Sequence, residues 1–293
     1  MKQTSKLTAV LLALFILTIF SCKKDIEPEN TADSEAAIFQ LLPPEKTGVA
    51  FQNALEEGLN TNILMYEYFY NGGGVAAGDL NGDGFTDLYI TSNMGENKLY
   101  LNTGKGKEIK FTDVTAASWA GGRPGPWKTG VNLVDINGDG RLDIYLCYSG
   151  AMPEEKRRNQ LFINLGNKDG GLPYFAEKAN EYGLDSPAFS NQSYFLDYDR
   201  DGDLDMILLN HNPKNLPMLN EAQTAELFKT DDPLKGIRLF RQDNGRFSDV
   251  TKQAGISGSQ LSYGLGVGIS DFDGDGWADF YVSNDYNVPD YLY

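Results

Sequence analysis

Four short stretches of the sequence decide its fold: DLNGDGFTD (79–87), DINGDGRLD (135–143), DYDRDGDLD (197–205) and DFDGDGWAD (271–279). They align without gaps on the pattern D-x-[DN]-x-D-G-x-x-D. A pattern that returns in one register at intervals of tens of residues marks an internal repeat. The chain therefore consists of similar structural units, each with one acidic loop.

Short runs of β-branched and aromatic residues surround each loop, and such runs predict strands. The loop therefore joins the first two strands of a unit, and the second strand is predicted at 88–90, 144–146, 206–208 and 280–282. Two more strands follow downstream. The third is predicted at 97–100, 159–162, 237–240 and 290–293, and the fourth at 111–115, 174–179 and 247–251.

Repeated units of four short strands predict an all-β fold, a β-propeller in which each unit is one blade. About four blades fit into residues 46–293, and the fourth lacks its last strand. Residues 48–53 resemble a last strand and are a candidate to close the ring. Because an open array exposes unpaired strand edges, we also expect the chain to be the N-terminal part of a longer propeller.

The loop pattern suits a hard cation. Oxygens at positions 1, 3 and 5 of a curling loop point toward one centre, while position 7 offers a main-chain carbonyl and position 9 a closing carboxylate. Such oxygen sets are what Ca²⁺ prefers. Glycine at position 6 permits the sharp turn. The loops hold 15 of the 41 acidic residues, and a cation would relieve their mutual repulsion.

The loop pattern also allows other interpretations. Asp/Gly-rich turns without any metal are the first alternative. An EF-hand is excluded, because position 12 is Ile90, Leu146, Leu208 or Val282 where that motif needs glutamate. Magnesium usually retains several waters and avoids all-protein ligand sets, so calcium is favoured.

These loops, with N-x-L-[YF] at 97–100 and 159–162 and F-x-D-V-T at 111–115 and 247–251, resemble the FG-GAP/VCBS repeat family. That family includes the integrin α-subunit propellers and relatives of cartilage acidic protein. The resemblance covers residues 46–293 and implies a calcium-stabilised propeller, usually of seven blades, that acts as an interaction module. It implies about four Ca²⁺ ions, one per loop. The implied side-chain ligands are Asp79, Asn81, Asp83 and Asp87; Asp135, Asn137, Asp139 and Asp143; Asp197, Asp199, Asp201 and Asp205; and Asp271, Asp273, Asp275 and Asp279. The main-chain carbonyls would come from Phe85, Arg141, Asp203 and Trp277.

The N-terminus reads as a targeting segment. Lys2 and Lys6 precede an apolar run, residues 7–20, which is shorter than the ~20 residues of a membrane span. Residues 19–22 (IFSC) resemble a bacterial lipobox, which implies a signal peptide over 1–21 and lipidation at Cys22. An ordinary signal peptide with a chance cysteine is the alternative. Residues 23–27 resemble the charged tag of Bacteroidetes surface lipoproteins, and residues 22–45 read as a tether. The expected location is the outer membrane, exposed at the cell surface.

Charge and cysteine content exclude several classes of function. Lys and Arg total 25 against 41 Asp and Glu, a net charge of −16, which disfavours binding to nucleic acid or to anionic lipid. A single histidine excludes a multi-histidine zinc site. Cys22 and Cys147 provide no disulfide framework.

Partner binding is predicted on the face opposite the acidic loops, because the long insertions 119–127, 149–158 and 211–235 all lie there. For the individual candidate residues, an ordinary structural role is the alternative to ligand binding. Trp127 is a sugar-stacking residue or, like Phe189 and Tyr263 at the same offset, a packing residue. Arg157 and Arg158 bind an acidic ligand or form a solvated charge run. The remaining candidates are Trp119 and His211, the latter as a catalytic base or an ordinary surface-loop histidine.

The favoured function is a non-catalytic calcium-binding module that recognises a protein or glycan. A polysaccharide lyase or hydrolase built on a calcium propeller is the alternative, and a structural spacer is a third. The sequence has no nucleophile motif, no phosphate-binding loop and no G-x-S-x-G. Bond cleavage across a panel of polysaccharides would favour the enzyme, whereas binding without turnover would favour the module.

Overall fold

A computed structural model describes residues 39–293, except 107, 214–218 and 286–287. The chain divides into residues 1–42 and a second unit, 43–293, which contains all the strands discussed below. The predicted signal peptide, Cys22 and most of the predicted tether lie outside the described residues. Among the described helices, none combines the length and the apolar character that crossing a bilayer requires.

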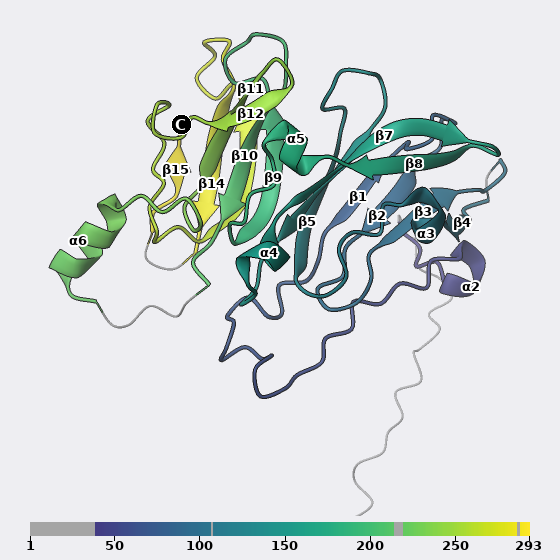
Figure 1. Cartoon of the computed structure of the whole chain (residues 1–293), viewed down its shortest axis with the longest axis horizontal. Coiled ribbons are helices and arrows are strands. Elements are labelled where there is room, and N and C mark those ends of the chain that lie inside the picture. The colour runs from purple at the N-terminus through teal and green to yellow at the C-terminus, as the bar shows by residue number, and fades with distance from the viewer. Residues whose placement is uncertain (1–38, 107, 214–218, 286–287) are drawn as a thin grey trace, which may run out of the picture. The chain divides into compact units, whose positions relative to one another are not determined.

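Four antiparallel sheets follow one another along the chain, each a blade whose strands pair in sequence order (Figure 1). The strands are β1 (Val75–Gly78), β2 (Asp87–Ile90), β3 (Lys98–Asn102) and β4 (Phe111–Asp113) in blade 1; β5 (Lys128–Val134), β6 (Asp143–Tyr148), β7 (Gln160–Lys168) and β8 (Leu172–Glu177) in blade 2; β9 (Ser190–Leu196), β10 (Asp205–Asn210), β11 (Arg238–Asp243) and β12 (Arg246–Asp249) in blade 3; and β13 (Gly264–Ser270), β14 (Asp279–Asn284) and β15 (Tyr291–Leu292) in blade 4. The first strands of neighbouring blades contact one another, as the inner strands of a propeller do. The predicted β-propeller fold is confirmed.

Short helices precede the first strand and occupy several connections between strands. They are α2 (Pro44–Thr47), α3 (Thr115–Ser118), α4 (Glu154–Arg157), α5 (Ala179–Tyr182) and α6 (Glu221–Lys229). Among the helices of the described residues only α6 exceeds one turn, and it begins with a capping box between Asn220 and Gln223. This helix lies inside the insertion 211–235, which the sequence analysis treated as a loop.

Blades are held together by alternating side chains on their middle strands. In β6, Ile144 and Leu146 pack against blade 1, whereas Tyr145 and Cys147 pack against blade 3. Successive residues of a strand point to opposite faces, so a strand buried between two blades must be apolar throughout. Cys147 is therefore a core residue, and its burial raises the pKa of its thiol to about 12.

Residues 48–53 do not close a ring, and that prediction is wrong. Blade 4 is a three-stranded sheet whose order ends at β15, and residues 48–53 belong to no strand. This segment lies beside the outer strands of blade 1 instead, where a Cβ on Gly48 would come within 2.4 Å of the Phe111 carbonyl oxygen. A positive φ of 80° at Gly48 turns the chain at the end of α2 and directs it past that edge.

Candidate functional site

The four acidic loops share one network of local hydrogen bonds. In the first loop, the carboxylate of Asp79, at position 1, accepts main-chain N–H groups of Gly82, Asp83 and Gly84 at 2.7–3.2 Å. Asp271 accepts from the same three positions of its loop, and Asp135 and Asp197 accept from positions 5 and 6 of theirs. The first aspartate thus curls each loop around its own side chain.

Left-handed backbone at two positions makes this curl possible. The glycine at position 6 has φ between 82° and 97° in all four loops, which confirms the reason for its presence. Position 4 is also left-handed, and in the third loop it is Arg200, with φ 62°. The Arg200 guanidinium carbon lies 5.0 Å from the centre of the Trp277 ring, so the side chain links the third loop to the fourth. Sequence reasoning missed this contact.

In the first three loops position 9 holds a buried aspartate that ties the loop to the third strand of its blade. Asp143 is fully buried and accepts N–H groups from Ile136 at 3.1 Å and from Asn164 on β7 at 2.7 Å. Asp87 and Asp205 make the equivalent pairs of bonds. Burial raises the pKa of Asp87, Asp143 and Asp205 to about 6, against the opposing effect of the N–H donors, and the other loop aspartates raise it further.

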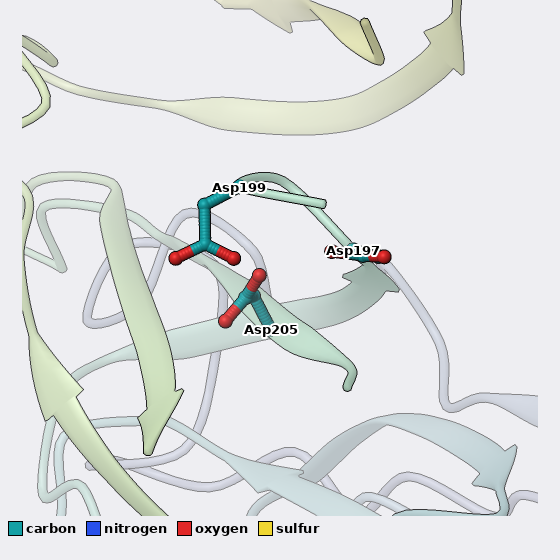
Figure 2. A group of neighbouring side chains, drawn as sticks. All are labelled: Asp197, Asp199 and Asp205. Atoms are coloured by element: carbon teal, nitrogen blue, oxygen red, sulfur yellow. The ribbon is translucent and has the colours of Figure 1, made fainter. Parts of the chain in front are cut away.

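Carboxylates converge most closely in the third and fourth loops. In each of the sets Asp197–Asp199–Asp205 and Asp271–Asp273–Asp279, one oxygen per residue lies within 4.8 Å of the others. Figure 2 shows the Asp199 carboxylate directed toward that of Asp205, with Asp197 at the start of the same loop. In the first two loops Asn81 and Asn137 stand at position 3 and bring an amide oxygen instead.

Two oxygens in the third loop have no protein donor. Oδ1 of Asp199 and Oδ1 of Asp203 are shielded from solvent, and neither accepts a hydrogen bond from the described residues. Shielded carboxylate oxygens without a donor are costly unless a cation is close to them. The third loop therefore has the chemistry of a cation site, and the oxygen-only donor set fits Ca²⁺.

The second loop differs through its own cation. Arg141, at position 7, donates to Oδ2 of Asp139 at position 5 and also binds the Asn164 carbonyl oxygen. An arginine on a predicted ligand competes with a metal for the same oxygen. We therefore expect this loop to bind calcium more weakly than the third.

The face opposite the acidic loops is partly covered by the chain itself. The segment between α2 and β1, purple in Figure 1, passes across the ends of the blades. Asn53 bonds Ser92 and Asn93 of blade 1, and Tyr66 bonds Ser149 of blade 2 and His211 of blade 3. The aromatic cluster of Tyr66, Tyr68, Phe69, Trp127 and Tyr263 extends this contact to blade 4. The aromatic run 66–70 was the available signal, and the sequence analysis missed it.

Three predicted partner residues are buried, two of them beneath this cover. Trp127 is 6% exposed, with ring centres 5.5 Å from Tyr66 and 5.3 Å from Phe69, so the packing alternative holds. His211 is 1% exposed, contacts the Tyr66 hydroxyl at 3.1 Å, and burial lowers its pKa to about 3. The expectation of a surface-loop histidine is therefore wrong. Arg157 is 7% exposed and stacks on Phe189, so it is not part of a solvated charge run.

Two predicted partner residues remain at the surface. Trp119 is 65% exposed, has φ 63°, and carries the Lys168 amino group 4.0 Å from its ring centre. Arg158 is partly exposed and pairs with Glu154 and Asp185, both at 2.8 Å. Neither contact identifies a ligand, and the predicted roles of both residues stay predictions.

Comparison with known proteins agrees with the repeat. The FG-GAP-like repeat family model matches residues 68–146 and 223–282. Integrin alpha-4 of Xenopus laevis is 31% identical over 155 residues, covering 47% of this chain and 14% of the integrin. Cartilage acidic protein 1 of Xenopus tropicalis is 25% identical over 238 residues, covering 79% of this chain and 30% of that protein, and the human protein is 28% identical over 138 residues.

The chain thus spans less than a third of the length of these relatives. Its four blades and four acidic loops nevertheless carry the repeat across the described propeller. The matched segments are therefore similar to FG-GAP-like repeats, and the third acidic loop, which lies between them, has the same pattern.

Proposed function

We propose that this chain is a calcium-stabilised recognition module, exported and held at the outer membrane through a lipid on Cys22. The observation that carries the calcium part is the third loop, where three carboxylates converge and two shielded oxygens have no donor. Similarity to integrin alpha-4 and to cartilage acidic protein 1 supports an interaction role.

The residues that would hold the ion are those of positions 1, 3, 5 and 9 in each loop, with the main-chain carbonyl of position 7. A bound Ca²⁺ supplies positive charge at the centre of each loop and so removes the repulsion among its aspartates. The protein's own contribution is preorganisation, because position 1 already curls the loop and position 9 fixes it to the third strand. The rigid blades then present the insertions on the opposite face.

Thermal unfolding of the purified chain with calcium and with a chelator tests the metal. Saturation at 100 times Kd adds about 2.7 kcal/mol for each site that forms only in the folded state. Asp199→Asn should reduce this gain, because it removes a converging carboxylate. Asp243→Asn, a surface aspartate outside the loops that pairs with Arg241, is the matched control and should not. Equal melting curves in calcium and in chelator would contradict the proposal that the loops bind calcium.

Lipidation at Cys22 is tested separately, by labelling cells that express the chain with an alkyne fatty acid. We expect labelled protein in the membrane fraction and, for Cys22→Ser, unlabelled protein released to the medium or periplasm. Labelling that survives Cys22→Ser, or a soluble unlabelled parent chain, would contradict the anchor. The outcome does not depend on whether the loops bind calcium.

A further inference from the structure

A cavity of about 760 Å³ lies between blades 1 and 2, on the face opposite the acidic loops. Its walls are the β2–β3 connection, the start of α3 and the insertion 119–127, and its lining includes Lys98, Arg123 and Lys128. The volume is in the range of pockets that enclose small ligands. The segment that covers the aromatic cluster contributes no residue to this lining.

Lys128 is an unusual wall residue because it is a buried cation. It is 1% exposed, and its Nζ donates to the carbonyl oxygens of Gly95 at 2.6 Å and Gly125 at 2.8 Å, both of which also line the cavity. Within the described part of the chain, no carboxylate lies within ion-pair distance of Nζ. Burial lowers the pKa of this amine to about 8, against the opposing effect of the Glu96 carboxylate, so it stays mostly charged at neutral pH. An ammonium without an anion is costly to bury.

The repeat does not require a lysine at this position. Lys128 lies seven residues before the first aspartate of its loop, and the equivalent residues of the other blades are Gly72, Ser190 and Gly264. Three of the four blades therefore have glycine or serine at this position. The lysine is therefore specific to blade 2, where the cavity is.

The cavity carries positive charge in a strongly acidic protein. Lys98 is neutralised by Asp113 at 3.1 Å and Glu96 at 3.6 Å. Arg123 binds carbonyl oxygens of Lys156 and Arg158 and lies over the Tyr148 ring, so like Lys128 it meets dipoles and no carboxylate among the described residues. Two cations without an ion-pair partner among the described residues thus line one hollow of a chain whose net charge is −16.

Small residues keep the cavity open. Ala116 and Ala117 of α3 form part of its wall, and both are exposed. Ala116 and Ala117 directly follow the D-x-T segment of blade 1. The residues that align with them are Asn180 and Glu181 in blade 2 and Lys252 and Gln253 in blade 3. Blade 1 alone places two alanines there.

We propose that this cavity binds the carboxylate of a small acidic ligand, with Lys128 and Arg123 as its cationic contacts. The carboxylate would provide the missing counter-charge, and the bidentate geometry of a guanidinium suits it. This inference rests on the proposed recognition function and gives it a ligand class. Sugar acids and acidic amino acids share that chemistry.

Calorimetric titration of the whole chain in saturating calcium tests the proposal. The probes are glucuronate and N-acetylglutamate, with glucose and N-acetylglutaminamide, in which both carboxyl groups are replaced, as their uncharged counterparts. We expect at least one acid to bind and its uncharged counterpart to bind at least tenfold more weakly. A preference for glucuronate would indicate a sugar acid, and a preference for N-acetylglutamate an acidic residue. Absence of binding by both acids, or equal binding by the uncharged probes, would overturn the proposal.

Two variants localise the binding. Lys128→Met removes the buried charge and Ala117→Trp fills the hollow from an exposed position, and each should weaken binding at least tenfold. Gln253→Trp, at the position of blade 3 that corresponds to Ala117, is the matched control and should change affinity less than twofold. If Lys128→Met does not fold, Ala117→Trp decides, and unchanged affinity in that variant would refute the site. Melting with chelator on the same samples reports the calcium proposal independently.

Discussion

The two faces of the blade array are built in different ways. On the acidic-loop face every blade repeats the same short-range bonds, as when Asp135 holds Asp139 and Gly140 within its own loop. On the opposite face the contacts of the covering segment occur once and join distant parts of the chain, as when Tyr66 meets Ser149 and His211. The first face is held by hydrogen bonds from main-chain N–H groups to carboxylates, whose negative charge a cation can neutralise. The second face is held by the burial of aromatic side chains. The difference predicts that the two faces respond to different perturbations.

Removing calcium should have the largest effect and should act on the acidic-loop face alone. With about 2.7 kcal/mol per saturated site, several loops together exceed any single substitution. The effect should be the same size in Tyr66→Ala as in the parent chain, because the loops and the aromatic cluster share no residues and distant changes add. A denaturant titration of both proteins with and without calcium measures this. Strong non-additivity would show that the two faces are coupled.

Tyr66→Ala should lower the free energy of unfolding by about 3–5 kcal/mol, because it empties the centre of a buried aromatic cluster. The loss should be equal in calcium and in chelator. Tyr70→Ala is the matched control from the same segment, and since Tyr70 is 55% exposed we expect a change within about 0.5 kcal/mol. Equal losses in the two variants would mean that the segment does not hold the face as described.

Two aspartates of the second loop allow a role in holding the loop in place to be distinguished from a role as a calcium ligand. Asp143→Ala leaves the N–H groups of Ile136 and Asn164 without an acceptor, so it should cost about 1–3 kcal/mol even in chelator. Asp139→Ala, at a solvent-facing position of the same loop, should cost stability mainly in calcium. Chemical unfolding of both variants in the two buffers checks this. If Asp143→Ala lost stability only in the calcium buffer, the role of Asp143 would be purely that of a ligand.

The pH response of His211 should be the smallest effect and belongs to the opposite face. Its pKa is about 3 when folded and about 6.5 when unfolded, so the unfolded chain binds more protons between these values. Stability is therefore retained above pH 6.5 and lost as pH falls. The groups around His211 are Tyr66, Tyr68, Ser149 and Phe189, none of them charged at neutral pH.

His211 alone should contribute about 1 kcal/mol of destabilisation between pH 6.5 and 5.5. His211→Gln should flatten that part of the stability curve relative to the parent chain, measured in chelator so that calcium release does not contribute. An unchanged slope would show that His211 is not kept neutral by burial.

Local patterns carried the prediction of the blades and of the loop geometry. The turn at position 6 of each loop needs a positive φ, which glycine adopts in every blade. Runs of β-branched and aromatic residues such as 144–146 form strands in every blade. The buried role of Asp143 was predicted only as a ligand, because its partner Asn164 lies 21 residues away on another strand. Arg200 at a left-handed position was not foreseen, since nothing in its neighbours marks it.

The sequence by itself determined the repeat, the strand order within each blade and the acidic loops, because these depend on residues within one unit and on periodicities that can be counted. Only the tertiary structure decided that residues 53–69 cover the opposite face, that Trp127, Arg157 and His211 are buried, and that Lys128 lines a cavity. Those outcomes depend on contacts such as Tyr66 to His211, separated by 145 residues. Such contacts leave no local pattern, since burial is set by what the rest of the chain brings alongside.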